Sequence, residues 1–130
     1  MMPVASIVET VMGMLETGEP GPTIGLLAPG AVLWHNDDAV EIDAKTGFER
    51  IGGLHALVKD VHVEVTRADQ ISDGVVIRFV IGGVVKSSGA PLAARNCIFV
   101  HLDGGRITRV EEYVDPTFRS QLAPPASDRP

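Results

Sequence analysis

Apolar residues near the start of the chain recur with the spacing of an amphipathic helix. They are Val4, Ile7, Val8, Val11, Met12 and Leu15. Steps of three and four residues place such side chains on one helical face, and the pattern stops at Gly18. Residues 19–22 (EPGP) cannot continue a helix, because proline lacks an amide hydrogen and has a fixed φ. We expect a short second helix after them, capped by Thr23 and stopped by Pro29 and Gly30.

Beyond residue 30 the pattern is mostly that of strands. Residues 31–36 predict a first strand, residues 37–50 are acidic and irregular, and Gly52-Gly53 opens a third helix. The apolar period then becomes two, because valines at 61, 63 and 65 alternate with polar residues. The remaining expected strands are separated by a loop or a glycine-containing turn and cover residues 75–85, 92–102 and 106–114.

Helices come first in this order, and strands joined by short turns follow. The order predicts an α+β fold in which three helices pack on one face of a strongly curved, mixed but mostly antiparallel sheet. Such a sheet forms a cone, and its open end is where a pocket can form. The length suits one domain, expected over residues 1–122, with residues 123–130 as a flexible tail.

The composition excludes some classes of binding partner and of site. The 130 residues carry a formal net charge of −6 and only 11 Lys and Arg, so we expect neither nucleic acid nor an anionic membrane as a partner. Cys97 is the only cysteine, which excludes an intrachain disulfide and a Cys-rich zinc site. The apolar N-terminal stretch contains Glu9 and follows no basic residue, unlike a signal peptide or a membrane span. We therefore expect a soluble, cytoplasmic protein.

A charged residue on an otherwise apolar strand face is the most informative position near the C-terminus. Thr108, Val110, Glu112 and Val114 share one face of the last expected strand. If this face lines the pocket, Glu112 is a carboxylate placed between two valines and away from water. Such a group can act as a general base near neutral pH.

Three more polar residues complete the candidate site. Arg78 stands between two valines on its strand face, where it would pair with Glu112 from a neighbouring strand. Trp34 and Asn36 point the same way from the first strand, and their N–H and amide groups could hold a water or a carbonyl oxygen.

Each of these residues also has a structural interpretation. Glu112 and Arg78 could form an ion pair on the outer sheet face or at a dimer interface. Trp34, the only tryptophan, could be part of the core. Asn36 could simply bond the backbone of the turn that follows it.

His35 and Asp37 are secondary candidates. His35 lies close to Asp37 and Asp38 in the sequence, which suggests a base or a metal ligand. Strand alternation, however, turns His35 away from Trp34 and Asn36. We therefore expect a functional role less for His35 than for its neighbours.

The layout resembles the nuclear transport factor 2-like (NTF2-like) superfamily and its SnoaL-like branch, which includes polyketide cyclases, ketosteroid isomerase and limonene-1,2-epoxide hydrolase. The resemblance spans residues 3–122. It is carried by the AVLWHN strand at 31–36, the helix opened by Gly-Gly, and the terminal hairpin DGGRITRVEEYVDP at 103–116. It implies a cone-shaped fold that often forms homodimers through the outer sheet face. The fold hosts unrelated reactions and non-catalytic binders alike.

Within this branch, three motifs are most similar to those of limonene epoxide hydrolase. Residues 34–36 (WHN) match its first-strand Tyr-x-Asn, residues 78–80 (RFV) match its Arg-x-Asp, and Glu112 matches the carboxylate of its last strand. The resemblance implies that Glu112 activates a water held by Asn36 and partly by Trp34, and that Arg78 orients the base.

One position departs from that family. Val80 stands where the family has the aspartate that protonates the opening epoxide, and general acid catalysis contributes roughly 10²–10⁴-fold. The loop at 37–50 could supply a replacement, such as Asp37 or Asp38.

The two other activities of the branch, isomerisation and cyclisation, imply catalytic roles for a different set of residues. The first-strand base of ketosteroid isomerase falls near His35 and its later acid near Cys97, although the first helix here has no tyrosine. SnoaL-type cyclases need fewer fixed groups, typically one acid–base residue in an apolar cavity, and Glu112 could fill that role.

Two hypotheses result. The first is a cofactor-free and metal-free acid–base enzyme acting on a small apolar molecule, with Glu112 as the base and with hydrolysis, isomerisation and cyclisation all left open. The second is a non-catalytic binding or dimerisation module, in which Arg109, Glu111 and Tyr113 supply contacts on the outer sheet face. A homodimer is expected under both.

Overall fold

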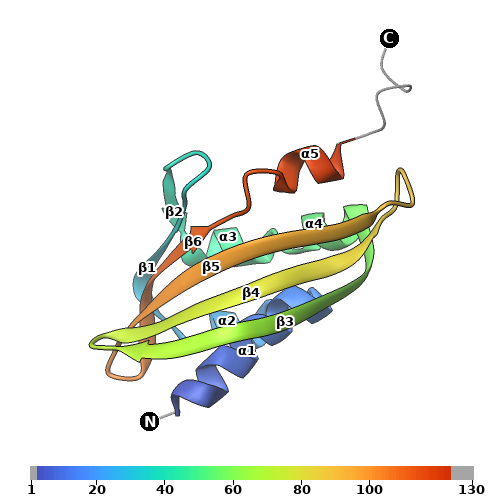
Figure 1. Cartoon of the computed structure of the whole chain (residues 1–130). Coiled ribbons are helices and arrows are strands. Elements are labelled where there is room, and N and C mark those ends of the chain that lie inside the picture. The colour runs from blue at the N-terminus through green and yellow to red at the C-terminus, as the bar shows by residue number, and fades with distance from the viewer. Residues whose placement is uncertain (1–2, 124–130) are drawn as a thin grey trace.

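The computed structural model describes residues 3–123 and contains a six-stranded sheet with helices on one face (Figure 1). The helices are α1 (Val4–Thr17), α2 (Gly21–Ile24), α3 (Ala44–Glu49), α4 (Gly52–Leu57) and α5 (Phe118–Leu122). The strands are β1 (Leu27–His35), β2 (Glu41–Asp43), β3 (Val58–Ile71), β4 (Gly74–Val85), β5 (Pro91–Asp103) and β6 (Arg106–Tyr113).

The order of the strands brings distant parts of the chain together. The order is β2-β1-β6-β5-β4-β3, so the first strand lies beside the last. β1 and β6 are parallel, whereas every other neighbouring pair is antiparallel. The sheet is therefore mixed and mostly antiparallel, and the α+β class predicted from the sequence is confirmed.

The inner face of the sheet, which meets the helices, is built from alternate residues of the long strands. In β4 these residues are Val75, Ile77, Phe79 and Ile81, all of them buried. α1 packs against β3 and β4 through Ile7 and Val11, which have almost no exposed surface. In Figure 1, α1 and α2 lie behind β3 and β4, and α3 and α4 lie behind β5. The even-numbered residues of β4 consequently point to the outer face.

α1 confirms the helix predicted from the apolar periodicity. Gly18 ends it in the left-handed conformation, with φ of 75°, and its N–H donates to the carbonyl of Met14. At 14 residues α1 is the longest of the described helices, and none within residues 3–123 is long and apolar enough to cross a membrane.

The second helix differs from its prediction. It ends at Ile24, and Thr23 does not cap it, because the Thr23 hydroxyl donates to the carbonyl of Thr10 in α1 at 3.3 Å. Pro29 and Gly30 do not stop a helix but lie within β1, where the register with β6 shifts. A shifted register of this kind tolerates a proline that a regular ladder would exclude.

Residues 37–50 are more ordered than predicted. They contain the short edge strand β2 and the helix α3. Asp43 caps α3, since its carboxylate accepts hydrogen bonds from the backbone N–H and the hydroxyl of Thr46, both at 3.1 Å. The predicted tail, apart from Ala123, lies outside the described residues.

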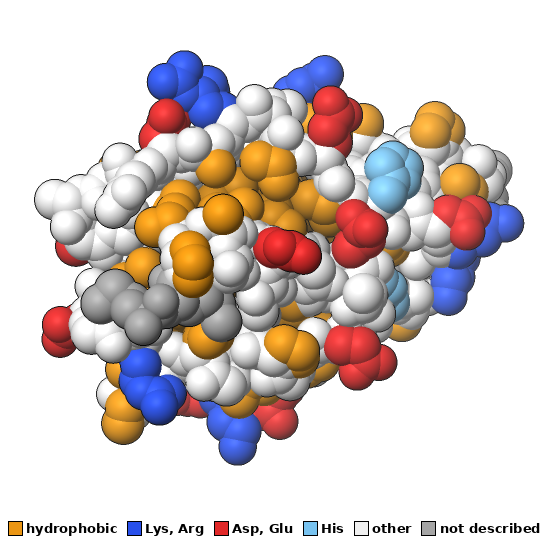
Figure 2. All heavy atoms as spheres, turned by 90° about the horizontal axis from the view of Figure 1, so that it is seen from below, with side chains coloured by type: hydrophobic (Ala, Val, Ile, Leu, Met, Phe, Trp, Pro, Cys, Tyr) orange, Lys and Arg blue, Asp and Glu red, His pale blue; other side chains and the backbone are white. Residues whose placement is uncertain are grey.

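The surface seen from below the view of Figure 1 has no single dominant charge. In Figure 2, apolar side chains show in a shallow hollow, and acidic side chains stand around it. Lys and Arg are spread between them on this face rather than gathered in one basic patch.

Gly74, the first residue of β4, is a position where a side chain would not be tolerated. An added Cβ would overlap the backbone oxygen of Val100 on β5. We expect Gly74→Ala to lower the free energy of unfolding by about 1–3 kcal/mol, because the two strands would have to move apart. Urea unfolding followed by circular dichroism measures the change.

Gly13 offers the matched control. It lies inside α1, and nothing lies within 4 Å of an added Cβ. Gly13→Ala should raise the free energy of unfolding by about 0.5–1 kcal/mol, since alanine loses less backbone entropy in a helix. Equal stability of Gly74→Ala and the wild type would contradict the close approach of β4 and β5.

Candidate functional site

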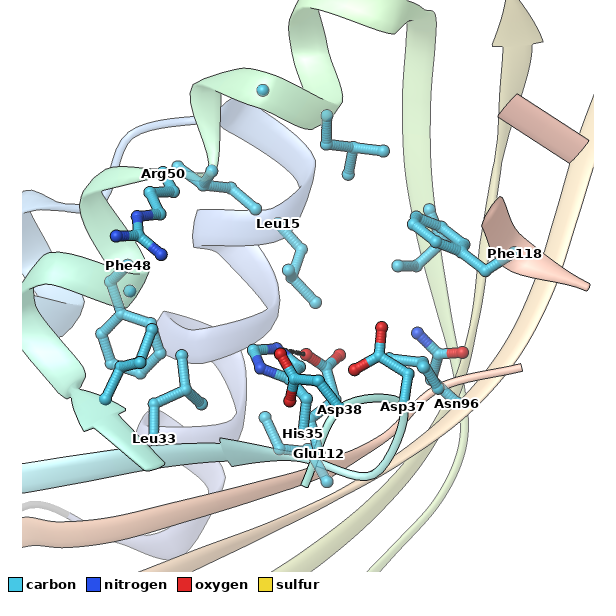
Figure 3. A pocket seen from close by; sticks show the side chains of 18 of the residues that line it. Leu15, Leu33, His35, Asp37, Asp38, Phe48, Arg50, Asn96, Glu112 and Phe118 are labelled. Atoms are coloured by element: carbon cyan, nitrogen blue, oxygen red, sulfur yellow. Dashed lines mark ion pairs between the residues drawn. The ribbon is translucent and has the colours of Figure 1, made fainter. Parts of the chain in front are cut away.

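A cavity of about 600 Å³ lies between the inner face of the sheet and the helices. Its walls are mostly apolar and include Val11 and Leu15 of α1, Leu33 of β1, Phe48 of α3, Ile98 of β5 and Phe118 of α5. Figure 3 shows Leu15, Phe48 and Phe118 on different sides of this space. Small-molecule sites have volumes of roughly 300–1,000 Å³, so the cavity has the size of a ligand pocket.

Polar residues gather in the cavity where β1 and β6 end. His35 and Glu112 lie opposite each other in the register of these strands. His35 Nε2 is 3.0 Å from Glu112 Oε1, and the dashed line in Figure 3 marks this pair. The two side chains are 30% and 14% exposed, respectively. The pair therefore lies within the cavity rather than on the open surface.

Glu112 changes the protonation of His35. Its hydrogen bond to the imidazole makes the largest contribution and raises the pKa of His35 above the usual 6.5. Burial of the ring lowers this pKa, while the negative charges of Glu112, Asp37 and Asp38 raise it further. The net rise favours the protonated, imidazolium form of His35 beside the carboxyl group of Glu112.

Asp37 joins the end of β1 to α5. Its Oδ2 accepts hydrogen bonds from Nε and Nη2 of Arg119, at 2.9 and 2.6 Å. Burial raises the pKa of Asp37, but the hydrogen bond and charge of Arg119 outweigh it, and the pKa is lowered. Asp37 is consequently an ionised carboxylate and a poor proton donor, contrary to the expectation that this loop supplies a general acid through it.

α5 closes one side of the cavity with Phe118 and Leu122. Two sets of polar contacts hold it besides the ion pair with Asp37. Gln121 accepts the backbone N–H of Ala93 and donates to its carbonyl, both at 3.0 Å. Asp115 accepts the backbone N–H of Thr117 at 2.8 Å just before the helix. This short C-terminal helix thus forms part of the pocket wall.

Asn96 is a buried polar residue of the pocket that the sequence analysis did not select. It lines the cavity from β5 and is 6% exposed. Its Oδ1 accepts the backbone N–H of Asp115 at 2.9 Å. The sequence did contain a signal for Asn96. It shares one strand face with Ala94, Ile98 and Val100, which are all apolar. The same pattern had pointed to Glu112.

Arg78 does not join Glu112. Glu112 lies in the cavity, on the even-numbered face of β6 as expected, but Arg78 is exposed on the outer face of β4. Val80 shares that outer face, because the inner positions of β4 hold Phe79 and Ile81. The expected pairing of Arg78 with Glu112 is therefore wrong, and position 80 is not placed to supply a general acid.

Trp34 and Asn36 also lie outside the cavity lining. Trp34 packs edge-on against Tyr113, with ring centroids 5.3 Å apart. Phe99 also packs edge-on against Tyr113, with ring centroids 5.9 Å apart. Asn36 is exposed, and its Oδ1 accepts the backbone N–H of Val114 at 2.8 Å. Their expected place beside Glu112 is corrected. Asn36 does bond a backbone group, but that group belongs to Val114 after β6 and not to the turn that follows Asn36.

His35 takes the place expected of Trp34. The two residues do face opposite ways, as alternation predicted, but the odd-numbered face of β1 is the one that lines the pocket. Both faces of this strand carry apolar residues, with Leu33 on one and Val32 on the other. Periodicity alone therefore could not decide which face points inward.

A second histidine is paired on the outer face. His101 contacts Asp73 through Nδ1 at 2.9 Å and Glu111 through Nε2 at 2.7 Å. Burial lowers the pKa of His101, but the two carboxylates more than compensate, and the pKa is raised. Within residues 3–123, no three His, Cys, Asp or Glu side chains are arranged to share a metal ion.

The comparisons with known proteins identify the fold. No protein-family model matches the chain, and no curated protein matches it. A protein of ketosteroid isomerase-like fold from Catenulispora acidiphila, solved in complex with trimethylamine, is 22% identical with a TM-score of 0.78, covering 98% of this chain and 100% of its own. IdmH, a proposed polyketide cyclase of Streptomyces antibioticus, is 17% identical with a TM-score of 0.79, covering 93% and 98%.

A further solved structure agrees with these two. An NTF2-like protein from Burkholderia thailandensis is 16% identical with a TM-score of 0.78, covering 96% of this chain and 100% of its own. Identities this low establish the fold and not the activity. The chain has the NTF2-like fold, as the resemblance implied.

The ion pair makes a prediction for the titration of His35. A raised pKa means that the stabilisation from the pair is present below pH ~6.5 and is lost as the pH rises through the folded-state value. NMR titration should find the pKa of His35 above 6.5 in the wild type and lower in Glu112→Gln, which removes the negative charge. His101 is the internal control, because its carboxylate partners are on the outer face. An unchanged His35 titration in Glu112→Gln would contradict the pair.

Proposed function

We propose that this chain is a cofactor-free acid–base enzyme that acts on a small, largely apolar molecule in the cavity, with Glu112 as the base. The observation that carries the proposal is the His35–Glu112 pair, at 3.0 Å, inside a mostly apolar cavity of about 600 Å³. A carboxylate that is shielded from water and aimed at an apolar ligand is suited to remove a proton from it.

The two side chains of the pair have different proposed roles. His35 binds Oε1 of Glu112, which fixes the orientation of the carboxylate and balances its charge. The other oxygen, Oε2, is then the one that accepts the proton from the substrate. His35 is in this scheme a positioning residue, and it takes the role that the sequence analysis gave to Arg78.

Proton transfer on carbon, as in isomerisation or aldol cyclisation, fits this site better than epoxide hydrolysis. An epoxide hydrolase-like site would need an acid beside the base, but Val80 faces outward and Asp37 is ionised against Arg119. Asp38 also lines the cavity, but its Oδ1 accepts the backbone N–H of Val40 and no contact joins it to Glu112 among the described residues. The proposed polyketide cyclase IdmH and the ketosteroid isomerase-like protein have the same fold, which supports the proposal by analogy.

The test begins with a ligand screen by thermal shift, using lipophilic enones, steroids, polyketide-like aromatics and epoxides. A ligand at 100 times its dissociation constant stabilises the folded state by about 2.7 kcal/mol, which such a screen detects. Turnover of each hit is then compared between variants. Glu112→Gln should lower kcat by about 10²–10⁴-fold, the usual contribution of a general base.

Glu111→Gln is the matched control for this experiment. Glu111 is the neighbouring glutamate in the sequence, but it pairs with His101 on the outer face and does not line the cavity. Its replacement should leave kcat within about twofold, as expected for a surface ion pair far from the chemistry. Full turnover by Glu112→Gln would contradict the assignment of the base.

We also propose that a second copy of the chain covers the outer sheet face, as a dimerisation module of this fold would require. Tyr113 is 44% exposed there and forms an aromatic cluster with Trp34 and Phe99. Charged residues border the cluster, including Glu111 and Arg109, which pairs with Glu41. Aromatic residues with a polar rim are the usual composition of an interface.

Sedimentation velocity tests the dimer. The wild type should sediment as a particle of twice the 13.8 kDa chain mass. Tyr113→Asp should sediment as a monomer at the same concentration, because a two-fold interface would contain the new charge twice. A monomeric wild type would contradict this proposal and leave the acid–base proposal untouched.

A further inference from the structure

Arg50 is the one cation of the cavity lining that has no ion-pair partner among the described residues. Arg119 also lines the cavity, but it is paired with Asp37. His35 is paired with Glu112. Arg50 is exposed at the edge of the cavity, so its guanidinium is accessible to a ligand that enters.

The backbone of Arg50 is fixed between two helices. Arg50 follows α3, and its N–H donates to the carbonyl of Gly47 at 3.2 Å. Its own carbonyl accepts the N–H of Gly53 in α4 at 2.9 Å. Figure 3 shows the side chain of Arg50 near Phe48 and apart from Glu112. The unpaired cation is therefore on the helix side of the cavity, away from the ends of β1 and β6.

The acidic residues of the lining lie on the other side of the cavity. Asp37, Asp38 and Glu112 come from β6 and from the loop that follows β1. A ligand carboxylate placed there would be repelled, whereas beside Arg50 it would form a hydrogen-bonded ion pair. Apolar side chains such as Leu15 line the space between the two sides. A ligand with one carboxylate is therefore oriented with its acid group at Arg50 and its apolar body toward Glu112.

We infer that Arg50 binds a carboxylate of the substrate and that the substrate class is a monocarboxylic acid with an apolar body. The inference rests on the proposed function, because it names the substrate class of the same cavity. A guanidinium donates two parallel hydrogen bonds to one carboxylate, which fixes the direction of the ligand as well as adding affinity. The carboxylate takes no part in the reaction, and the proton is removed from the apolar body beside Glu112.

Two probes of similar shape that differ in charge test the inference. 2-Naphthylacetate has a carboxylate attached to an apolar ring system, and 2-naphthylacetamide has a neutral amide in its place. By isothermal titration calorimetry, the wild type should bind the acetate about fivefold more tightly than the amide, which is the upper range for an exposed ion pair. An acetate that binds no more tightly than the amide would overturn the inference.

Two substitutions of Arg50 separate its charge from its packing. Arg50→Gln removes the charge and should weaken acetate binding by about fivefold, while amide binding changes by less than about twofold. Arg50→Lys keeps the charge and should bind the acetate within about twofold of the wild type. Equal loss of both probes in Arg50→Gln would mean that the aliphatic part of Arg50 only packs against the cavity wall, and would overturn the inference.

Lys45→Gln is the matched control. Lys45 is an exposed cation of α3, the helix that precedes Arg50, and it lies outside the cavity lining. Its replacement removes the same charge from the same part of the surface and should leave the affinities for both probes within about twofold of the wild type. Equal loss of acetate affinity in Lys45→Gln and Arg50→Gln would mean that only the net charge matters, and would overturn the assignment to Arg50.

Glu112→Gln separates this inference from the proposed function. It removes the proposed base and one negative charge of the cavity, so the acetate should bind at least as tightly as it does to the wild type. Turnover that needs Glu112, in a protein that does not prefer the acetate to the amide, would overturn the role of Arg50 and leave the base in place. A preference for the acetate that needs Arg50, without turnover of any hit from the ligand screen, would support the carboxylate site and contradict the base.

Discussion

The ion pair between His35 and Glu112 is the interaction on which the site depends. A lone carboxylate in an apolar cavity would lose its hydration with nothing to replace it, and such a group avoids burial or becomes neutral. The imidazole of His35 supplies the missing partner at 3.0 Å, and the parallel register of β1 and β6 places it there. The pair leaves one carboxylate oxygen for the proposed proton transfer, and the apolar walls contributed by the helices and the other strands give the cavity its mostly apolar lining.

Polar residues on the two faces of the sheet lie in different environments, although in the sequence they belong to one alternating pattern. On the inner face, polar groups are few and lie at one end of the cavity: the half-buried His35 and Glu112 and the buried Asn96. On the outer face they are more exposed and paired with each other, as His101 is with Asp73 and Glu111. A buried polar group without a complete set of partners can bind a ligand, whereas one that is already paired mainly holds strands in register.

The fold was largely predictable from the sequence, and the site only in part. Periods of 3.6 and 2 identified α1 and the long strands, because each buries one face and exposes the other. Which face of a strand points inward was predictable where one face is uniformly apolar. In β4, for example, Ile77, Phe79 and Ile81 contrast with Arg78, and this contrast indicates that Arg78 faces outward.

The sequence-based predictions that were wrong for β1 and for the loop after it failed for physical reasons. Both faces of β1 carry apolar residues, so Trp34 and His35 could not be ranked by alternation. The partner of β1 is the last strand of the chain, and a pairing between residues so distant in sequence has no local signal. The edge strand β2 and the helix α3 are short, and they form where tertiary contacts outweigh the polar composition of residues 37–50.

The position of β6 has a consequence for how the chain folds. β1 lies between β2 and β6, and β6 follows β3, β4 and β5 in the chain. Until β6 is available, one edge of β1 has unpaired backbone groups, so the sheet closes only after all the other strands have been made. Contacts between such distant segments slow folding, because the chain loses much entropy before they form. The cavity, whose polar end joins these two strands, is therefore complete only after β6 has paired with β1.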